Sequence, residues 1–117
     1  MDTLVIYHNP GCSKSRSALA LLQARQVPLQ VIEYLKQPPA RAELVALSRK
    51  LGLPPAQWIR AGEAEYRAAG LSADSGDDAL LDAMTQYPIL IERPIVVCGD
   101  RALVGRPPER VLELLAD

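Results

Sequence analysis

The sequence confines its β-rich segments to the two ends of the chain, and this order constrains the fold more than any other feature. Residues 3–7 and 29–34 are rich in β-branched and apolar side chains, which is typical of buried strands. Between them a helix is expected from Ser13, because its apolar residues fall on one face. A strand, a helix and a second strand within about thirty residues predict a right-handed unit with parallel strands.

Strands return only near the C-terminus. Residues 94–98 and 102–104 predict an antiparallel hairpin around a Gly-Asp turn, and a last helix is expected through residues 111–115. A parallel pair and a hairpin in one sheet give a mixed four-stranded α/β fold. We therefore predict a thioredoxin-like fold with the order βαβ…ββα, and a single domain over residues 1–117.

The region between strands 2 and 3, residues 38–87, is predicted to be a helical insertion. Four helices are expected there, over residues 38–51, 54–60, 63–69 and 77–86. Ser75 or Asp77 is the expected cap of the last one. Trp58 is expected in the packed interior, and Arg60 at the end of its helix.

Composition excludes several classes of protein. With 13 Lys and Arg against 14 Asp and Glu in 117 residues, the net charge of -1 disfavours a nucleic-acid or membrane-surface binder. Two cysteines and one histidine disfavour a disulfide scaffold or a metal centre, so we expect no metal and no bound cofactor. The apolar stretches are too short for a membrane span or a signal peptide, which predicts a cytoplasmic protein with reduced thiols.

The most informative segment is His-Asn-Pro-Gly-Cys-Ser-Lys-Ser-Arg, residues 8–16. Cys12 follows a strand and begins a helix, where backbone N–H groups lack intrahelical partners. These groups and the helix dipole stabilise a thiolate and can bind an anion. Ser13 and Ser15 are expected to cap the helix and to donate to a bound anion.

The charges around Cys12 also favour an anion. Lys14 and Arg16 lie in the first turn, where cations oppose the helix dipole. Residues 3–32 contain no acidic side chain, although the chain holds 14 acids. A chance acid-free stretch is the alternative interpretation, but we favour a functional thiol or anion site.

Other thiol chemistries do not fit the spacing. A Cys-x-x-Cys dithiol would need cysteine where Ser15 stands, and a tyrosine-phosphatase loop would need arginine where Ala18 stands. The glycines of a Walker loop are missing, and His8 is the only histidine that a cysteine protease could use. The thiol chemistry that remains is that of a single nucleophilic cysteine in a positively charged pocket.

Arginine outnumbers lysine ten to three, and most of these arginines are expected on the solvated surface. Three stand at predicted chain breaks. Arg60 ends the helix that contains Trp58, Arg93 precedes the third strand, and Arg106 follows the fourth. In the predicted fold, these breaks are able to converge on the N-terminus of the first helix.

Three blocks carry a resemblance to a known family. They are His-Asn-Pro-x-Cys-Ser-x-Ser-Arg (residues 8–16), Arg-Pro-Ile-Val-Val (93–97) and Gly-Arg-Pro-Pro-Glu (105–109). In this order and spacing, which covers essentially the whole chain, the sequence resembles the glutaredoxin-coupled arsenate reductases, closest to their short bacterial branch. The resemblance implies a thioredoxin-like fold with an inserted helical lobe.

The resemblance also implies a role for each matching residue. Cys12 resembles the nucleophile, His8 and Ser15 the residues that help to ionise it, and Pro94 the cis-proline that faces it. The implied oxyanion ligands are the three arginines named above, Arg60, Arg93 and Arg106. Guanidinium groups bind oxyanions in a planar, bidentate way.

The implied reaction is the reduction of arsenate to arsenite. The Cys12 thiolate attacks arsenic, glutathione serves as co-substrate, and glutaredoxin resolves the mixed disulfide. The implied partners are an oxyanion, glutathione and glutaredoxin, and the protein is expected to be a monomer. One alternative is reduction of another oxyanion or of a mixed disulfide. The other is a non-catalytic regulator of the Spx type, whose Cys-x-x-Cys switch is interrupted here by Ser15.

Cys98 has two interpretations. It is either a resolving thiol or an ordinary strand thiol near the hairpin turn. On the implied fold, Pro94 lies beside Cys12, and Cys98 is four strand residues further along, about 13 Å at ~3.3 Å per residue. Because a disulfide requires Cα atoms within about 7 Å, we favour the strand thiol.

Overall fold

The computed structural model describes residues 3–115 and divides the chain into two compact units. Unit 1 combines the two ends of the chain, up to Gln37 and from Arg93, and unit 2 is Pro38–Glu92. Unit 2 thus extends past residue 87, where the sequence predicted the end of the insertion. Among the described residues, no helix is long and apolar enough to span a bilayer.

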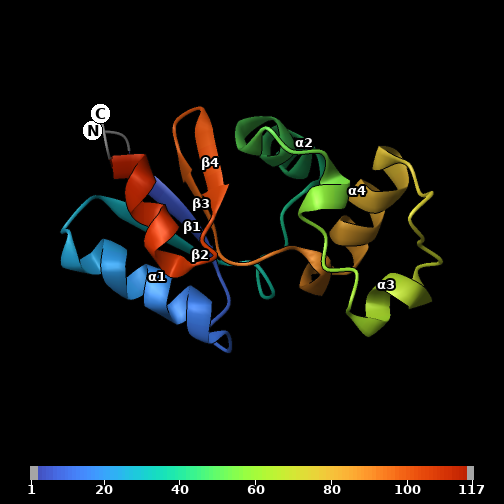
Figure 1. The fold of residues 1–117 in the computed structure, drawn as a ribbon, viewed down its shortest axis with the longest axis horizontal. Coiled ribbons are helices and arrows are strands. Elements are labelled where there is room, and N and C mark those ends of the chain that lie inside the picture. Colours follow the sequence, from blue (N-terminus) through green and yellow to red (C-terminus); the bar gives the residue numbers. More distant parts are fainter. Residues whose placement is uncertain (1–2, 116–117) are drawn as a thin grey trace. The chain divides into compact units, whose positions relative to one another are not determined.

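Unit 1 is built on one mixed sheet with the strand order β2-β1-β3-β4 (Figure 1). The strands are β1 (Leu4–His8), β2 (Leu29–Glu33), β3 (Ile95–Cys98) and β4 (Arg101–Val104). Strand β1 runs parallel to β2 and antiparallel to β3, and β3 and β4 form the predicted hairpin. The predicted thioredoxin-like βαβ…ββα fold is confirmed.

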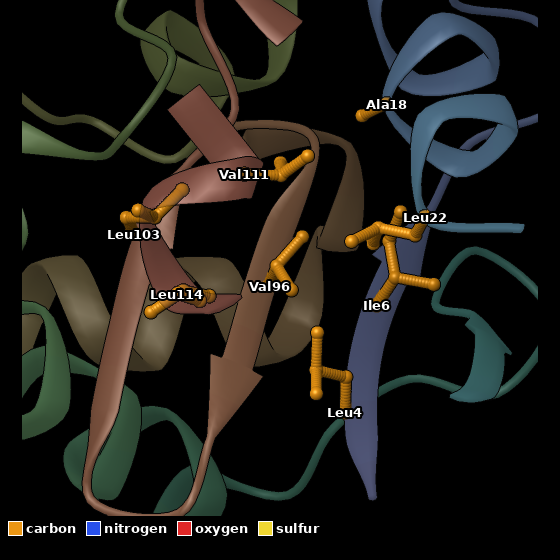
Figure 2. Close-up of a cluster of buried hydrophobic side chains, with 8 residues drawn as sticks. All are labelled: Leu4, Ile6, Ala18, Leu22, Val96, Leu103, Val111 and Leu114. Atoms are coloured by element: carbon orange, nitrogen blue, oxygen red, sulfur yellow. The ribbon is translucent and has the colours of Figure 1, made fainter. Parts of the chain in front are cut away.

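Two helical segments cover one face of this sheet (Figure 1). They are α1 (Ser13–Ala24) and the 3-10 helix η3 (Pro108–Leu115), which lies where a terminal helix was predicted. Figure 2 shows the core between the sheet and these segments, made of Leu4, Ile6, Ala18, Leu22, Val96, Leu103, Val111 and Leu114. This core holds α1, and therefore Cys12 at its start, against the sheet.

Unit 2 is mainly helical, with its own buried centre. Its elements are α2 (Arg41–Leu51), α3 (Ala64–Ala68), α4 (Asp77–Gln86) and the 3-10 turns η1 (Pro55–Gln57) and η2 (Pro88–Leu90). Trp58 is only 1% exposed, and its indole N–H donates to Ser48 Oγ at 3.2 Å, which confirms its predicted interior position.

Three local predictions in unit 2 are wrong. Helix α2 begins at Arg41 and not at the prolines, because the backbone is still extended at its N-cap residue, Ala40, with φ -71° and ψ 160°. The predicted helix over residues 54–60 is only the turn η1, since Ile59 pairs with Ile91 in an isolated β-bridge instead. The cap of α4 is Gly76, without a side-chain hydrogen bond, and neither Ser75 nor Asp77.

Gly105 packs against Pro94, the residue that precedes β3. Its N–H donates to the Pro94 carbonyl at 2.8 Å. A Cβ at this position would lie 2.9 Å from both Pro94 Cγ and Val111 Cγ1, closer than real Cβ contacts. Because neither side chain has room to withdraw from a packed interior, only glycine fits here.

We expect Gly105→Ala to lower the free energy of unfolding by about 1–3 kcal/mol, the usual cost of overpacking. Denaturant unfolding followed by circular dichroism measures the loss. Gly62→Ala is the matched control, because a Cβ at Gly62 meets no atom within 4 Å. Equal stability of the two variants would contradict the close packing of Gly105.

Candidate active site

Cys12 is the N-cap residue of α1, with an extended backbone at φ -103° and ψ 123°. A tight turn leads into it from β1, in which the Cys12 N–H donates to the Asn9 carbonyl at 3.0 Å. The Asn9 side chain accepts the Gly11 N–H at 2.9 Å, which is a turn hydrogen bond typical of asparagine. The thiol is thereby held at the first turn of the helix, beside its free N–H groups.

The surroundings of the Cys12 sulfur favour the thiolate. Partial burial is the largest influence on the pKa of Cys12, and it acts to raise that pKa. The backbone N–H of Ser15, the side chain of Arg93 and the backbone N–H of Lys14 donate to the sulfur and lower the pKa. Because these hydrogen bonds and the charge of Arg93 outweigh burial, the pKa of Cys12 lies below its ordinary value.

This environment predicts the pH dependence of the thiol. A thiol with a lowered pKa is ionised, and therefore nucleophilic, at a pH where an ordinary thiol is protonated. We expect the alkylation rate of Cys12 by iodoacetamide to rise with pH at a midpoint below that of a free cysteine. Cys98, the last residue of β3, is the internal comparison once peptide mapping separates the two sites. A Cys12 midpoint at the free-cysteine value would contradict the stabilised thiolate.

The side chains of Ser15 and His8 interact with each other. Ser15 is fully buried, and its hydroxyl accepts the Asn9 N–H at 3.0 Å and lies 2.7 Å from His8 Nδ1. The prediction that the Ser15 hydroxyl caps α1 is therefore wrong, because this hydroxyl is engaged with the preceding turn. Its backbone N–H, and not its side chain, donates to Cys12.

The imidazole of His8 is held mainly in its neutral form. Burial is the largest influence on its pKa and lowers it, Glu33 raises it, and Arg16 lowers it. The pKa of His8 therefore lies below its ordinary value. A neutral His8 orders the turn through Ser15, and it does not act on the thiol as a nearby positive charge.

Two of the three predicted arginines meet in unit 1. The Arg93 side chain donates to the Cys12 sulfur, and Arg106 Nη1 donates to the Arg93 carbonyl at 3.1 Å. The peptide bonds Arg93–Pro94 and Arg106–Pro107 are both cis. Both arginines thus lie at chain breaks beside β3 and β4, with the first in direct contact with the nucleophile.

Arg60 belongs to unit 2 and has different neighbours. Its Nε donates to Glu63 Oε2 at 3.0 Å, and its Nη1 donates to Glu92 Oε1 at 2.7 Å. The sequence interpretation missed both carboxylates. The spacing of Glu63, three residues after Arg60, was a usable signal for an ion pair, whereas Glu92 lies far away in the sequence.

The first-turn cations lie on the surface. Helix α1 has no acidic residue in its first turn, and Lys14 and Arg16 are exposed. Arg16 donates to the Pro10 carbonyl at 2.8 Å, so its guanidinium braces the turn that carries the thiol. Two exposed cations therefore lie in the first turn of α1, within four residues of Cys12 along the chain.

Cys98 is a free thiol at the end of β3, partly buried against the core of unit 1. This packing supports the interpretation of Cys98 as a strand thiol.

Within residues 3–115, no three side chains of the metal-binding types lie close enough together to hold an ion.

The fold and the site define a class of protein. A thioredoxin-like sheet presents one activated cysteine at the N-terminus of a helix, with arginine beside its sulfur. Such a site suits a thiol-dependent reaction with a small anion.

The comparisons with known proteins identify the family. The model of the ArsC family matches residues 7–114. An arsenate reductase of Neisseria meningitidis serogroup A is 44% identical, with 98% of this chain and 100% of the relative covered. One of Escherichia coli (strain K12) is 42% identical, with 100% and 84% covered. A solved arsenate reductase from Vibrio cholerae has a TM-score of 0.91 and 49% identity, with 97% and 98% covered. The chain belongs to the ArsC family.

Proposed function

We propose that this protein is an arsenate reductase in which Cys12 is the nucleophile. The observation that carries the proposal is the set of donors on the Cys12 sulfur, two backbone N–H groups and the Arg93 side chain. Relatives named arsenate reductase, 42–45% identical over nearly the whole chain, support arsenate as the substrate. The same donors that stabilise a thiolate suit the oxyanion that it attacks.

The first step is attack of the Cys12 thiolate on arsenic, with loss of one arsenate hydroxyl, which takes up a proton from solvent and leaves as water. The product is a covalent S–As(V) adduct, and no electrons have moved to arsenic yet. Arg93 and Arg106 bind the arsenate oxygens and offset the negative charge that accumulates during attack. Pro94 shapes the wall beside the sulfur, and His8 and Ser15 hold the turn that presents it.

The second step needs an outside thiol. The thiol of glutathione attacks the adduct sulfur, the S–As bond breaks, and its electron pair leaves with arsenic. Arsenate has then gained two electrons and departs as arsenite, and Cys12 is joined to glutathione in a mixed disulfide. Glutaredoxin reduces this disulfide and restores the Cys12 thiol. Because this sequence requires reduced glutathione, we place the protein in the cytoplasm.

Three parts of this scheme stay predictions from the family resemblance. They are the use of glutathione as the thiol donor, the use of glutaredoxin as the resolving partner, and the monomeric state. The third arginine ligand, Arg60, also stays a prediction.

The test is arsenate-dependent oxidation of NADPH in the presence of glutathione, glutathione reductase and glutaredoxin. We expect turnover that requires both glutathione and glutaredoxin, together with equimolar arsenite. Replacing arsenate by phosphate is the control, because phosphate has the same shape and charge but is not reducible by thiols. No turnover at millimolar arsenate would contradict the activity. Turnover without glutaredoxin would contradict only its place in the scheme.

A further inference from the structure

The turn that follows β4 closes on the two residues that precede β3. The Gly105 N–H donates to the Pro94 carbonyl at 2.8 Å. The Arg106 side chain donates through Nη1 to the Arg93 carbonyl at 3.1 Å. We call Gly105 and Arg106 the β4 turn. Its two bonds hold two consecutive carbonyl groups of the chain, and all four residues belong to unit 1, as Cys12 does.

The close approach of the β4 turn depends on the lack of a side chain at Gly105. A Cβ at this position would lie 2.9 Å from Pro94 Cγ, 3.6 Å from Pro94 Cδ and 2.9 Å from Val111 Cγ1. Pro94 is buried, and Val111 has no exposed surface. Because a packed interior has little free volume, a methyl group at residue 105 has to displace at least one of these two side chains.

A displacement of Pro94 reaches the thiol through the residue before it. The side chain of Arg93 donates to the Cys12 sulfur. The backbone of Arg93 leads directly into Pro94, whose ring includes its own backbone nitrogen. A push on the ring is therefore also a push on the peptide group that links the two residues. Because hydrogen bonds weaken steeply at poor angles, a small shift of the Arg93 backbone weakens its bond to the sulfur.

Packing alone is the simpler explanation of the small residue at position 105. If Gly105 only fills space in unit 1, a methyl group there lowers the stability of the fold and leaves the thiol as it is. If Gly105 also aligns Arg93, the same methyl group changes the ionisation of Cys12. The two hydrogen bonds of the β4 turn favour the second explanation, because they end on the backbone of Arg93 and Pro94 and not in the apolar core.

We propose that Gly105 is a positioning residue for Arg93. Its missing side chain lets the β4 turn close on Pro94, and this closure aligns the Arg93 guanidinium with the Cys12 sulfur. The part of this proposal that concerns arsenate rests on the proposed function. The part that concerns the thiol does not, because the ionisation of Cys12 is measurable without arsenate.

The first test is the alkylation of Cys12 by iodoacetamide as a function of pH in Gly105→Ala. The substitution adds and removes no charge, so its effect on the thiol has to come from a change in geometry. We expect the midpoint to rise above the parent value, because a weaker bond from Arg93 stabilises the thiolate less. Peptide mapping separates Cys12 from Cys98, and circular dichroism establishes that the variant is folded. A parent-like midpoint in the folded variant would overturn the proposal.

Val111→Ala is the matched control for lost stability. It removes two methyl groups from the core of unit 1, so it is expected to destabilise the protein as Gly105→Ala does. It opens space beside Gly105 and adds no atom near Pro94, so the β4 turn keeps its bonds. We expect the parent midpoint in this variant. A midpoint raised as far as in Gly105→Ala would overturn the proposal, because general destabilisation would then explain both results.

The double variant Gly105→Ala/Val111→Ala tests the steric cause. Its new methyl group no longer meets Val111 Cγ1, so residue 105 has room to move away from Pro94. We expect a midpoint between those of the two single variants, since both changes affect the same space. A midpoint as high as in Gly105→Ala would contradict the role of the close approach and overturn the proposal.

The double variant also decides the question if Gly105→Ala alone does not fold. Its methyl group still faces Pro94 Cγ, whereas Val111→Ala has no atom there. The midpoint of the double variant is therefore expected to lie above that of Val111→Ala. Equal midpoints in these two variants would overturn the proposal.

Arsenate kinetics test the part of the proposal that concerns the reaction. We expect kcat/KM for Gly105→Ala to fall about tenfold at neutral pH, because a misplaced Arg93 serves both the thiolate and the oxyanion less well. Val111→Ala is expected to keep a kcat/KM close to the parent value. An unchanged kcat/KM in Gly105→Ala would overturn this part of the proposal.

The two kinds of failure are separable. If the parent protein does not reduce arsenate, the proposed function fails, and the alkylation midpoints still test the positioning of Arg93. If the parent protein reduces arsenate and the midpoint of Gly105→Ala does not rise, the positioning proposal fails alone.

Discussion

Replacement of Cys12 by serine is expected to abolish arsenate reduction, with a loss in kcat/KM on the order of 10³-fold or more. A serine hydroxyl stays protonated at neutral pH, so the donors around residue 12 have no thiolate to stabilise. Serine also cannot form a mixed disulfide with glutathione, and the formation of that disulfide is the oxidation that supplies two electrons to arsenic. The coupled NADPH assay measures the loss, and circular dichroism checks that the variant is folded.

Cys98→Ser is the matched control, because it removes the only other cysteine of the chain. Cys98 packs partly against the core at the end of β3 and has no assigned part in the reaction. We expect its kcat/KM to stay within a factor of about two of the parent value. Loss of turnover in Cys98→Ser would show that the chain supplies its own resolving thiol, which contradicts the need for glutathione.

The thiol loop was predictable because its interactions are local. The strand, the turn and the helix that place Cys12 follow one another within residues 4–24, and each has a sequence signal of its own. Turn residues such as Asn9 and Gly11 act within two positions of each other. Local patterns of this kind determine which backbone N–H groups are free, and therefore where a thiolate is stabilised.

The meeting of Arg93 with the sulfur was predictable only through the fold. The resemblance implied the thioredoxin-like fold, and the strand order of the structure brings the start of β3 beside the end of β1. The orientation of the buried Ser15 hydroxyl, by contrast, was not predictable from the fold. In the sequence, Ser15 stands where a helix cap is expected. In the structure, its hydroxyl instead accepts the Asn9 N–H and lies against the ring of His8.

The surroundings of Arg60 were not predictable from local patterns. The sequence predicts a helix over residues 54–60, but Ile59 forms a bridge to Ile91, which lies 32 positions further along. That bridge brings Glu92 to the guanidinium. Pairings between short segments so far apart have no periodic signal, so the ion pair between Arg60 and Glu92 appears only in three dimensions.

Arg93→Gln is expected to lower kcat/KM for arsenate by about 10²-fold, the usual cost of removing one charged donor from a site of this kind. The Arg93→Gln substitution acts in two ways. Glutamine has no positive charge to offset the oxyanion, and it weakens the hydrogen bond that lowers the pKa of Cys12. The alkylation midpoint therefore rises, and at a pH below that midpoint a smaller fraction of the thiol is ionised. The loss of activity is expected to be smaller at high pH, where the thiol of the variant is also ionised.

The pH profile separates these two contributions. The part of the loss that persists at high pH reports oxyanion binding by Arg93, and the part that disappears reports its effect on the thiol. Arg25→Gln is the matched control, because it removes an exposed arginine at the far end of α1. We expect that control to keep the parent midpoint. A parent-like midpoint in Arg93→Gln as well would contradict the bond between Arg93 and the Cys12 sulfur, on which the proposed site depends.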